Sequence, residues 1–330
     1  MAEPPRTVLI SGCSTGIGLE LAVQLAQDPR QRFQVVATMR DLGKKGMLEA
    51  AAGEALGQTL TVAQLDVCSD ESVAQCLSCI QGGEVDVLVN NAGVGLVGPI
   101  EGLSLAAMQK VFDTNFFGAV RLVKAVLPGM KKRRQGHIVV VSSVMGLQGV
   151  VFNEVYAASK FALEGFFESL AVQLLQFNIF VSLVEPGPVA TEFEGKLMEQ
   201  VSTAEFPGTD PDTLRYFRDS YLPASRELFR NVGQSPQDVV QSSGLRPTGH
   251  RQRHRLSQTT PAPTDQRPLR PADRAQSRGP LRRPVCANHP PPALPLATPP
   301  PPWPSMPGLR LPPPPGPAPV SRASPTPPHP

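Results

Sequence analysis

The sequence predicts an α/β fold built on a doubly wound parallel sheet, followed by a disordered tail. Two observations lead to this prediction. Over the first 187 residues, short aliphatic and β-branched runs alternate with helical stretches, which is typical of βα units around a parallel sheet. Residues 241–330 hold 27 of the 38 prolines and 12 arginines, with no Ile, Phe or Tyr, so they lack the side chains of an ordinary core. We therefore expect a folded domain over 1–240 and a disordered Pro/Arg-rich tail over 241–330.

Six strands are expected, and most read as continuous apolar runs because helices cover both faces of a parallel sheet. The strands are predicted at Thr7–Ser11, Gln34–Met39, Thr61–Asp66, Val85–Asn90, His137–Ser142 and Phe180–Glu185. The helices between them are predicted at Gly18–Gln27, Lys44–Ala55, Ser69–Ile80, Ser104–Met130 and Val155–Leu175. In such a fold, ligands bind at the carboxyl ends of the strands.

The segment 189–230 interrupts this alternation. It mixes Phe, Leu and Tyr with charged residues and is too apolar for a solvated loop, so it predicts one or two amphipathic helices that form a lid over a substrate. Pro207-Gly208 is expected to be a turn within this lid. Ser235-Pro236 begins another helix, with Ser as N-cap and Pro at the first helical position.

Composition excludes several functional classes. The first 240 residues carry 26 acidic against 19 basic side chains, which argues against a nucleic-acid partner. No apolar run approaches the roughly 20 residues that span a bilayer, and the N-terminus lacks the pattern of a signal peptide. Five cysteines, an odd number, fit reduced thiols, so we expect a cytoplasmic protein. Cys76-x-x-Cys79 has no second pair or nearby His, and no metal site is expected.

A glycine-rich turn follows the first strand and opens a helix. Its residues Gly12, Ser14, Thr15, Gly16, Ile17 and Gly18 suit a tight turn, a close backbone approach and a helix N-terminus that faces a pyrophosphate. The second strand ends at Met39-Arg40-Asp41, where proteins of this fold bind the ribose of a dinucleotide. An acidic side chain there favours NAD and a basic one favours NADP. This sequence has one of each side by side, Arg40 and Asp41.

Further small and polar residues follow the next strands. Asp66-Val67 ends the third strand, and Asn90-Asn91-Ala92-Gly93 ends the fourth. Both stretches are placed to line a cofactor, although Asn91-Ala92-Gly93 also fits an ordinary turn.

Ser142-Ser143 ends the fifth strand, and Tyr156 and Lys160 open the following helix. Their i, i+4 spacing places the phenol and the ammonium on one helical face. A nearby ammonium favours the phenolate of a tyrosine, which an acid/base acting on an alcohol or carbonyl near neutral pH requires. A lone Tyr-x-x-x-Lys also occurs by chance, as a surface pair.

Taken together, these motifs resemble the short-chain dehydrogenase/reductase family, with its Rossmann fold, over about residues 6–240. The matching positions are the glycine-rich turn, with Ser11 where Thr is usual, and Asn90–Gly93, Asn115, Ser143, Tyr156, Lys160, Pro186-Gly187 and Thr191. Val35–Asp41, Phe152–Tyr156 and Lys160–Gly165 look like the branch of the family that acts on retinoids and 17β-hydroxysteroids.

The resemblance implies a role for each residue. Tyr156 would be the general acid/base, Lys160 would lower its pKa and hold the nicotinamide ribose, and Ser143 would orient the substrate oxygen. Asn115 would bend its helix and anchor a water relay to Lys160. The nicotinamide end would meet Pro186, Gly187, Val189 and Thr191, whereas Ser14 and Arg40 match positions that favour the 2′-phosphate of NADP(H).

The implied reaction is NADP-dependent hydride transfer to or from a lipophilic alcohol or carbonyl, with all-trans-retinal/retinol first and estradiol/estrone as the alternative. A homodimer is also left open. Lys131–Arg134 is a basic cluster with two interpretations. It could contact anionic lipid at a membrane surface, or it could be a solvated helix end whose charges complement the helix dipole.

The C-terminal part departs from the family's pattern. The branch normally continues past Val240 with the rest of a helix and a seventh strand, and neither is legible here. We therefore expect the sheet to lack its last strand. A different class of function also stays open: an inactive truncated product whose PxxP spacing in Pro312–Pro319 binds SH3-like partners as polyproline II.

Overall fold

The computed structural model describes residues 4–242 of the 330-residue chain, and its centre is a six-stranded parallel sheet. The strand order is β3-β2-β1-β4-β5-β6, with every neighbouring pair parallel. The order reverses between β1 and β4, which is the doubly wound arrangement that the sequence predicts. The strands are β1 (Arg6–Ile10), β2 (Phe33–Met39), β3 (Leu60–Gln64), β4 (Val87–Asn90), β5 (Gly136–Val141) and β6 (Ile179–Val184).

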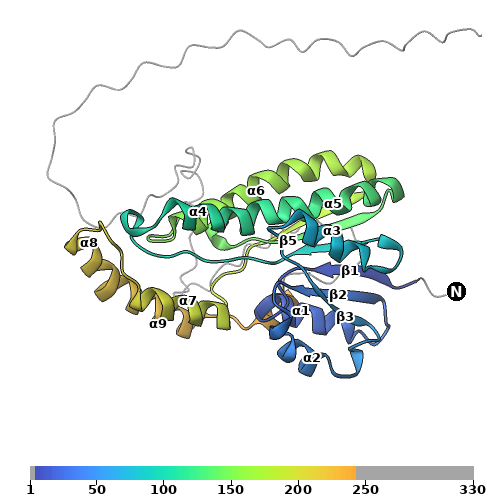
Figure 1. Ribbon diagram of the computed structural model, residues 1–330, viewed down its shortest axis with the longest axis horizontal. Coiled ribbons are helices and arrows are strands. Elements are labelled where there is room, and N and C mark those ends of the chain that lie inside the picture. The colour runs from blue at the N-terminus through green and yellow to red at the C-terminus, as the bar shows by residue number, and fades with distance from the viewer. Residues whose placement is uncertain (1–3, 243–330) are drawn as a thin grey trace, which may run out of the picture. The chain divides into compact units, whose positions relative to one another are not determined.

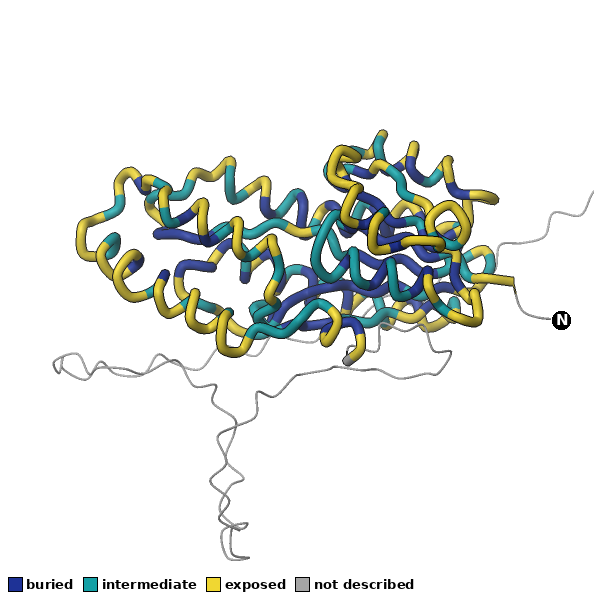
Figure 2. Tube along the Cα trace, turned by 90° about the horizontal axis from the view of Figure 1, so that it is seen from below, coloured by how far each residue is buried: buried dark blue, intermediate teal, exposed yellow. Residues whose placement is uncertain are grey.

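Helices cover both faces of this sheet, as Figure 1 shows. Along β1, Val8 and Ile10 belong to the core shared with α1 and α2, whereas Leu9 belongs to the core shared with α3, α5 and α6. All three are fully buried, because successive side chains of a strand point to opposite faces. Figure 2 shows buried residues along the strands and exposed ones on the outer sides of the helices. The first helices are α1 (Gly16–Ala26), α2 (Gly46–Ala52), α3 (Asp70–Ser78), α4 (Leu105–Phe112), α5 (Gly118–Arg133) and α6 (Glu154–Leu174).

Two of the predicted helices are interrupted. The stretch expected at 44–55 is divided into two 3-10 turns, Leu42–Lys44 and Gly53–Ala55, with α2 between them. Gly53 ends α2 because its φ of 53° is incompatible with a continuing right-handed helix. The helix expected at 104–130 is divided into α4 and α5 by a π-helical turn, Asp113–Phe117. Such turns occur frequently at functional sites.

The lid predicted at 189–230 is helical. It consists of α7 (Glu192–Thr203), α8 (Pro211–Arg215), a π-helical segment at Tyr216–Tyr221, and α9 (Leu222–Val232). Pro207 and Gly208 form the expected turn. The lid has its own apolar core, in which Phe217 is fully buried and contacts the rings of Phe152, Phe206 and Tyr221.

The last described helix is α10 (Pro236–Ser242). Ser235 caps it as predicted: its Oγ accepts a hydrogen bond from the Asp238 backbone N–H at 3.1 Å. Val240 is fully buried in the core on the α1 face of the sheet. Within residues 4–242 the sheet has six strands and no seventh. The disorder predicted for the Pro/Arg-rich tail falls on residues 243–330, outside the described residues.

Candidate active site

A cavity of about 410 Å³ lies at the carboxyl ends of the strands and continues beneath the lid. Its wall includes nearly all of the residues that the sequence assigned to a site. These are Gly12, Ser14, Thr15, Gly16, Ile17, Arg40, Asp66, Val67, Asn91, Ala92, Gly93, Ser143, Tyr156, Lys160, Pro186, Gly187, Val189 and Thr191. Gly18 and Asn115 lie outside this wall and contact residues that form it.

The glycine-rich turn needs its glycines for steric reasons. Gly12 has a φ of 74°, and a Cβ there would lie 2.9 Å from the Ala92 Cα. Gly16 has a φ of 64°, and a Cβ there would lie 3.3 Å from the Thr191 Cγ2. The backbone therefore lies at the cavity wall without side chains in the way, next to the N-terminus of α1. Unpaired N–H groups at a helix N-terminus suit a phosphate, so this turn fits a dinucleotide pyrophosphate.

Ser11, at the position where Thr is usual, joins the glycine-rich turn to the loop after β4. Its Oγ accepts hydrogen bonds from the backbone N–H groups of Asn91 and Ala92, at 3.0 and 3.1 Å. The Asn91 amide in turn donates to the carbonyl oxygens of Ser11 and Gly12, at 2.9 and 3.0 Å. The loop after β4 is thereby fixed to the glycine-rich turn. The departure at position 11 leaves the hydroxyl that makes these bonds in place.

Asn115 lies in the π-helical turn between α4 and α5 and is 2% exposed. Its Oδ1 accepts from the Val94 N–H at 2.7 Å, and its Nδ2 donates to the Val94 carbonyl at 2.9 Å and to the Ser159 Oγ at 3.0 Å. A Cβ built on Gly93 would lie 3.5 Å from the Asn115 Oδ1 and 3.9 Å from the Lys160 Nζ. Asn115 therefore joins the loop after β4 to α6, close to the Lys160 ammonium.

Ser143, Tyr156 and Lys160 meet at the centre of the cavity wall. The Tyr156 hydroxyl is hydrogen-bonded to Ser143, whose Oγ also accepts from the Met145 N–H at 3.1 Å. The Lys160 ammonium donates to the Val141 carbonyl at 2.9 Å and lies 5.6 Å from the centre of the Tyr156 ring. A hydroxyl that can exchange a proton is thus held by a second hydroxyl, with a cation on the same helical face.

Burial is the largest cause of the pKa shifts of Tyr156 and Lys160 in the protein without cofactor. Burial first and the Glu194 carboxylate second raise the pKa of Tyr156 to about 12, and the hydrogen bond from Ser143 opposes this shift. Burial also lowers the pKa of Lys160 to about 8, against the carboxylate of Glu164, which raises it. The sequence argument expected Lys160 to lower the Tyr156 pKa. In this structure the ammonium donates to a backbone carbonyl, and burial, which disfavours the phenolate, is the largest cause of the change in the Tyr156 pKa.

The two neighbouring charges after β2 take different positions. Arg40 is exposed and lines the cavity. The Asp41 carboxylate caps the following 3-10 turn: its Oδ1 accepts from the Gly43 N–H at 2.9 Å, and its Oδ2 lies 3.9 Å from the Lys44 Nζ. The carboxylate is therefore engaged in its own loop, and the guanidinium is the charge at the cavity.

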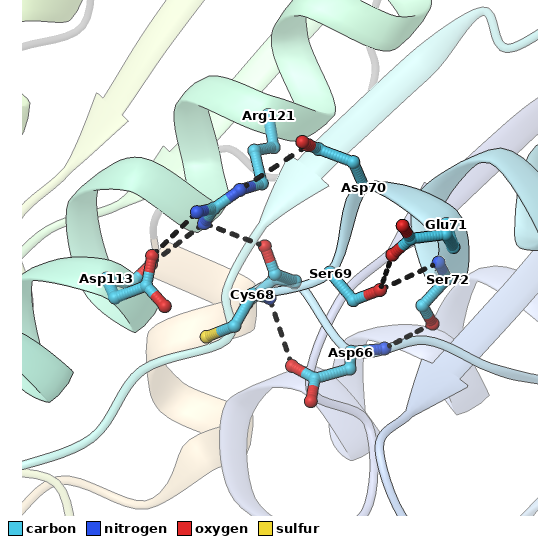
Figure 3. A network of polar contacts seen from close by, with 9 residues as sticks. Asp66, Cys68, Ser69, Asp70, Glu71, Ser72, Asp113 and Arg121 are labelled. Carbon is cyan, nitrogen blue, oxygen red and sulfur yellow. Dashed lines mark hydrogen bonds and ion pairs between the residues drawn. The ribbon is translucent and has the colours of Figure 1, made fainter.

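Arg121 on α5 holds the loop after β3, as Figure 3 shows. Its guanidinium pairs with the Asp113 carboxylate at 2.8 Å and donates to the Val67 carbonyl at 3.4 Å. The Asp66 carboxylate accepts from the Cys68 N–H at 3.0 Å. These contacts tie Asp66 and Val67, at the cavity wall, to the π-helical turn that carries Asn115.

The lid contributes residues that sequence reasoning did not assign individually. They are Phe193, Glu194, Leu197, Tyr221, Ser225, Leu228 and Phe229, and from below the lid Met145, Val150 and Asn153 also line the cavity. The Asn153 amide donates to the Tyr221 hydroxyl at 2.7 Å and joins the lid to the start of α6. The apolar composition of 189–230 predicted a lid but not which side chains face inward. The only local signal for Glu194 was its position three residues after Thr191, on the same side of a helix.

In the part of the chain that the structure describes, no helix is both long and apolar enough to cross a membrane. Among the same residues no group of three or more His, Cys, Asp or Glu side chains gathers in a way that would hold a metal ion. Cys76 is buried, whereas Cys79 is exposed.

Residues 6–202 match the family model for short chain dehydrogenases. Retinol dehydrogenase 8 of Bos taurus is 92% identical over 240 residues, which are 73% of this chain and 77% of that protein. Human 17-beta-hydroxysteroid dehydrogenase type 1 is 49% identical over 236 residues, 71% of each chain. A solved structure of an actinorhodin polyketide ketoreductase variant with NADPH has a TM-score of 0.62 and 29% identity, covering 74% of this chain and 91% of that one.

Proposed function

The chain belongs to the short-chain dehydrogenase family, and from that premise we propose that it is an NADP-dependent oxidoreductase that interconverts all-trans-retinal and retinol. The coarser statement, an alcohol dehydrogenase/reductase for retinoid-like or steroid-like substrates, already follows from the family and its relatives. The finer proposal concerns the cofactor, the residue roles and the substrate.

The observation that carries the proposal is the arrangement of Ser143, Tyr156 and Lys160 on one cavity with the glycine-rich turn. When bound, the nicotinamide supplies or accepts the hydride. The Tyr156 hydroxyl gives its proton to a substrate carbonyl oxygen, or takes one from an alcohol, while the Ser143 hydroxyl orients that oxygen. The Lys160 ammonium lies 5.6 Å from the centre of the Tyr156 ring and stabilises the phenolate that forms on reduction.

The end of the cavity at Arg40 supports binding of NADP(H) over NAD. Arg40 lines the cavity, whereas the carboxylate of Asp41 caps its own loop. A guanidinium suits a phosphate dianion, and a carboxylate at the ribose would be needed for a 2′-hydroxyl preference. The structure of the similar polyketide ketoreductase contains NADPH, which supports the same choice.

The substrate end supports a lipophilic alcohol or aldehyde. Away from Ser143 and Tyr156 the wall is formed largely by Val, Leu, Met and Phe side chains of the lid and the β5–α6 connection, as suits an apolar molecule with one reacting oxygen. The identity to retinol dehydrogenase 8 favours a retinoid. A steroid alcohol is the second candidate, because of the similarity to 17-beta-hydroxysteroid dehydrogenase type 1. A homodimer and a peripheral membrane contact stay predictions.

The test uses the purified full chain. NADPH consumption is followed with all-trans-retinal and with estrone, beside NADPH binding measured by fluorescence. Tyr156→Phe should lower kcat at least about 100-fold, the usual scale for acid/base catalysis, and should keep NADPH binding. Tyr216→Phe is the matched control, since Tyr216 is exposed and lies outside the cavity wall.

Faster turnover of estrone than of retinal would favour the steroid alternative. A chain that neither binds NADPH nor reduces either carbonyl would refute the enzymatic function and leave the binding-module alternative. Unchanged turnover in Tyr156→Phe would refute the assigned role of the hydroxyl.

A further inference from the structure

Asn153 occupies the N-cap position of α6, three residues before Tyr156. An Asn at this position ordinarily caps its helix by accepting a hydrogen bond from the N–H of the second or third helical residue, and here the third is Tyr156. The Asn153 side chain makes no such bond. Its amide instead donates to the Val151 carbonyl at 2.9 Å and to the Tyr221 hydroxyl of the lid at 2.7 Å. The residue is 5% exposed, so a buried side chain that would cap α6 is bonded to the lid.

The residue before Asn153 is also held by the lid. Phe152 has a φ of 60°, in the left-handed region that side chains other than glycine rarely adopt, and such strained residues persist only where their surroundings fix them. Its buried ring belongs to the apolar core of the lid, with the ring centres of Phe217 and Tyr221 at 4.9 and 5.1 Å. Its carbonyl accepts from the Gly98 N–H at 3.0 Å. The turn that leads into α6 therefore takes its conformation together with the lid.

Tyr221 is the lid residue that takes part in both contacts. Its ring packs against Phe152 and stacks on Phe217, with 5.5 Å between the last two ring centres, and its hydroxyl accepts from Asn153. Tyr221, Asn153 and Tyr156 line the same cavity. Asn153 and Tyr156 are three residues apart at the start of α6, so they lie on one side of the helix. A displacement of the Tyr221 hydroxyl is therefore transmitted through one hydrogen bond to the turn that carries Tyr156.

We propose that Tyr221 is a positioning residue: through its hydrogen bond with Asn153, the lid sets the placement of the Tyr156 hydroxyl relative to a substrate held beneath the lid. The inference rests on the proposed function of Tyr156. Proton transfer requires the donor to lie within hydrogen-bond reach of the substrate oxygen, and a small error in that placement slows the reaction strongly. The lid thus contributes to the rate of the chemical step as well as to binding of the apolar part of the substrate.

Steady-state kinetics of the full chain test the role of the hydroxyl. Tyr221→Phe removes the hydroxyl and keeps the ring. Tyr216→Phe is the matched control, because the Tyr216 ring also packs against Phe152, at 5.6 Å between centres, whereas its hydroxyl bonds to no other of the described residues. In Tyr221→Phe, kcat for reduction of retinal should fall about 3- to 10-fold, the effect of one hydrogen bond, with little change in KM or in the Kd of NADPH. Tyr216→Phe should leave all three values unchanged.

A double-variant cycle shows whether the effect passes through Asn153. It compares Asn153→Ala, Tyr221→Phe and the combination of the two. Residues that act through one shared hydrogen bond give non-additive effects. The combined variant should therefore have the same kcat as Asn153→Ala, because Tyr221 has no amide to hold once Asn153 is replaced.

Nuclear magnetic resonance follows Tyr156 without turnover, in the full chain isotopically labelled at the tyrosine Cζ. The chain has three tyrosines, so each Tyr→Phe variant assigns one signal by its loss. The Tyr156 signal should move in Tyr221→Phe and stay in place in Tyr216→Phe. In the Asn153→Ala background, Tyr221→Phe should cause no further movement. A movement that persists in that background would show that Tyr221 acts on Tyr156 directly across the cavity.

A Tyr156 signal that stays in place in Tyr221→Phe, or that moves equally with and without Asn153, would overturn the inference. So would a raised KM with unchanged kcat, because Tyr221 would then contribute to substrate binding alone, and so would an equal loss of kcat in Tyr216→Phe. If Asn153→Ala does not fold, Asn153→Ser takes its place, since a Ser can cap α6 but has a shorter side chain than Asn. The resonance measurement needs no turnover, so a chain that is inactive on retinal and estrone would count against the proposed function and leave this test intact.

Discussion

Replacement of Asn115 by Ala should lower the free energy of unfolding and weaken the attachment of the loop after β4, which forms part of the cavity wall. Asn115 makes three hydrogen bonds, two with the Val94 backbone and one with the Ser159 hydroxyl, between 2.7 and 3.0 Å, and is 2% exposed. At about 0.5–1.5 kcal/mol for each of the three bonds, the loss predicts a destabilisation of about 1.5–4.5 kcal/mol. The N–H and carbonyl groups of Val94 lose their partner, so the loop after β4 should become mobile near Lys160.

The assay is urea unfolding of the full chain, followed by far-ultraviolet circular dichroism with and without NADPH. Gln109→Ala is the control, because Gln109 is exposed on the neighbouring helix α4. Asn115→Asp separates the hydrogen bonds further: it keeps the acceptor for the Val94 N–H and loses both donated bonds. A destabilisation in Asn115→Ala below about 0.5 kcal/mol, the range of ordinary surface changes, would refute this reasoning, as would an equal effect in Gln109→Ala.

Two further predictions concern the ends of the cavity. Arg40→Ala should weaken NADPH binding by about 1.5–3 kcal/mol, the strength of a hydrogen bond to a charged group, and leave NADH almost unchanged; fluorescence titration with both cofactors measures this, and equal losses would show that Arg40 does not read the phosphate. Gly95→Ala should raise KM for the lipophilic substrate with little change in the Kd of NADPH, because its Cβ would lie 2.6 Å from Leu197 and 3.3 Å from Phe193 on the lid; steady-state kinetics tests it, and an unchanged KM would mean that the lid moves aside without cost.

The sequence by itself determined the order of strands and helices and the location of the motifs. Alternating apolar runs and helical stretches are readable in short windows, because backbone periodicity requires only neighbouring residues. The glycine-rich turn, Ser143 and the Tyr156/Lys160 pair are likewise local patterns at fixed spacing. Strand ends were accurate to within about two residues, as with β3, which ends at Gln64 and not at Asp66.

The tertiary structure alone decided which side chains meet across long separations. Asn115 bonds to Val94 and Ser159, 21 and 44 residues away, and nothing in its own helix indicates those partners. Only the structure places the Asp41 carboxylate in a cap of its own loop and Arg40 at the cavity wall. Glu194 lines the same cavity as Tyr156, on a helix whose neighbouring residues Thr191 and Leu197 lie against two glycines from other loops. Such contacts depend on how separate elements pack, and burial at the place where they meet is the largest cause of the raised pKa of Tyr156.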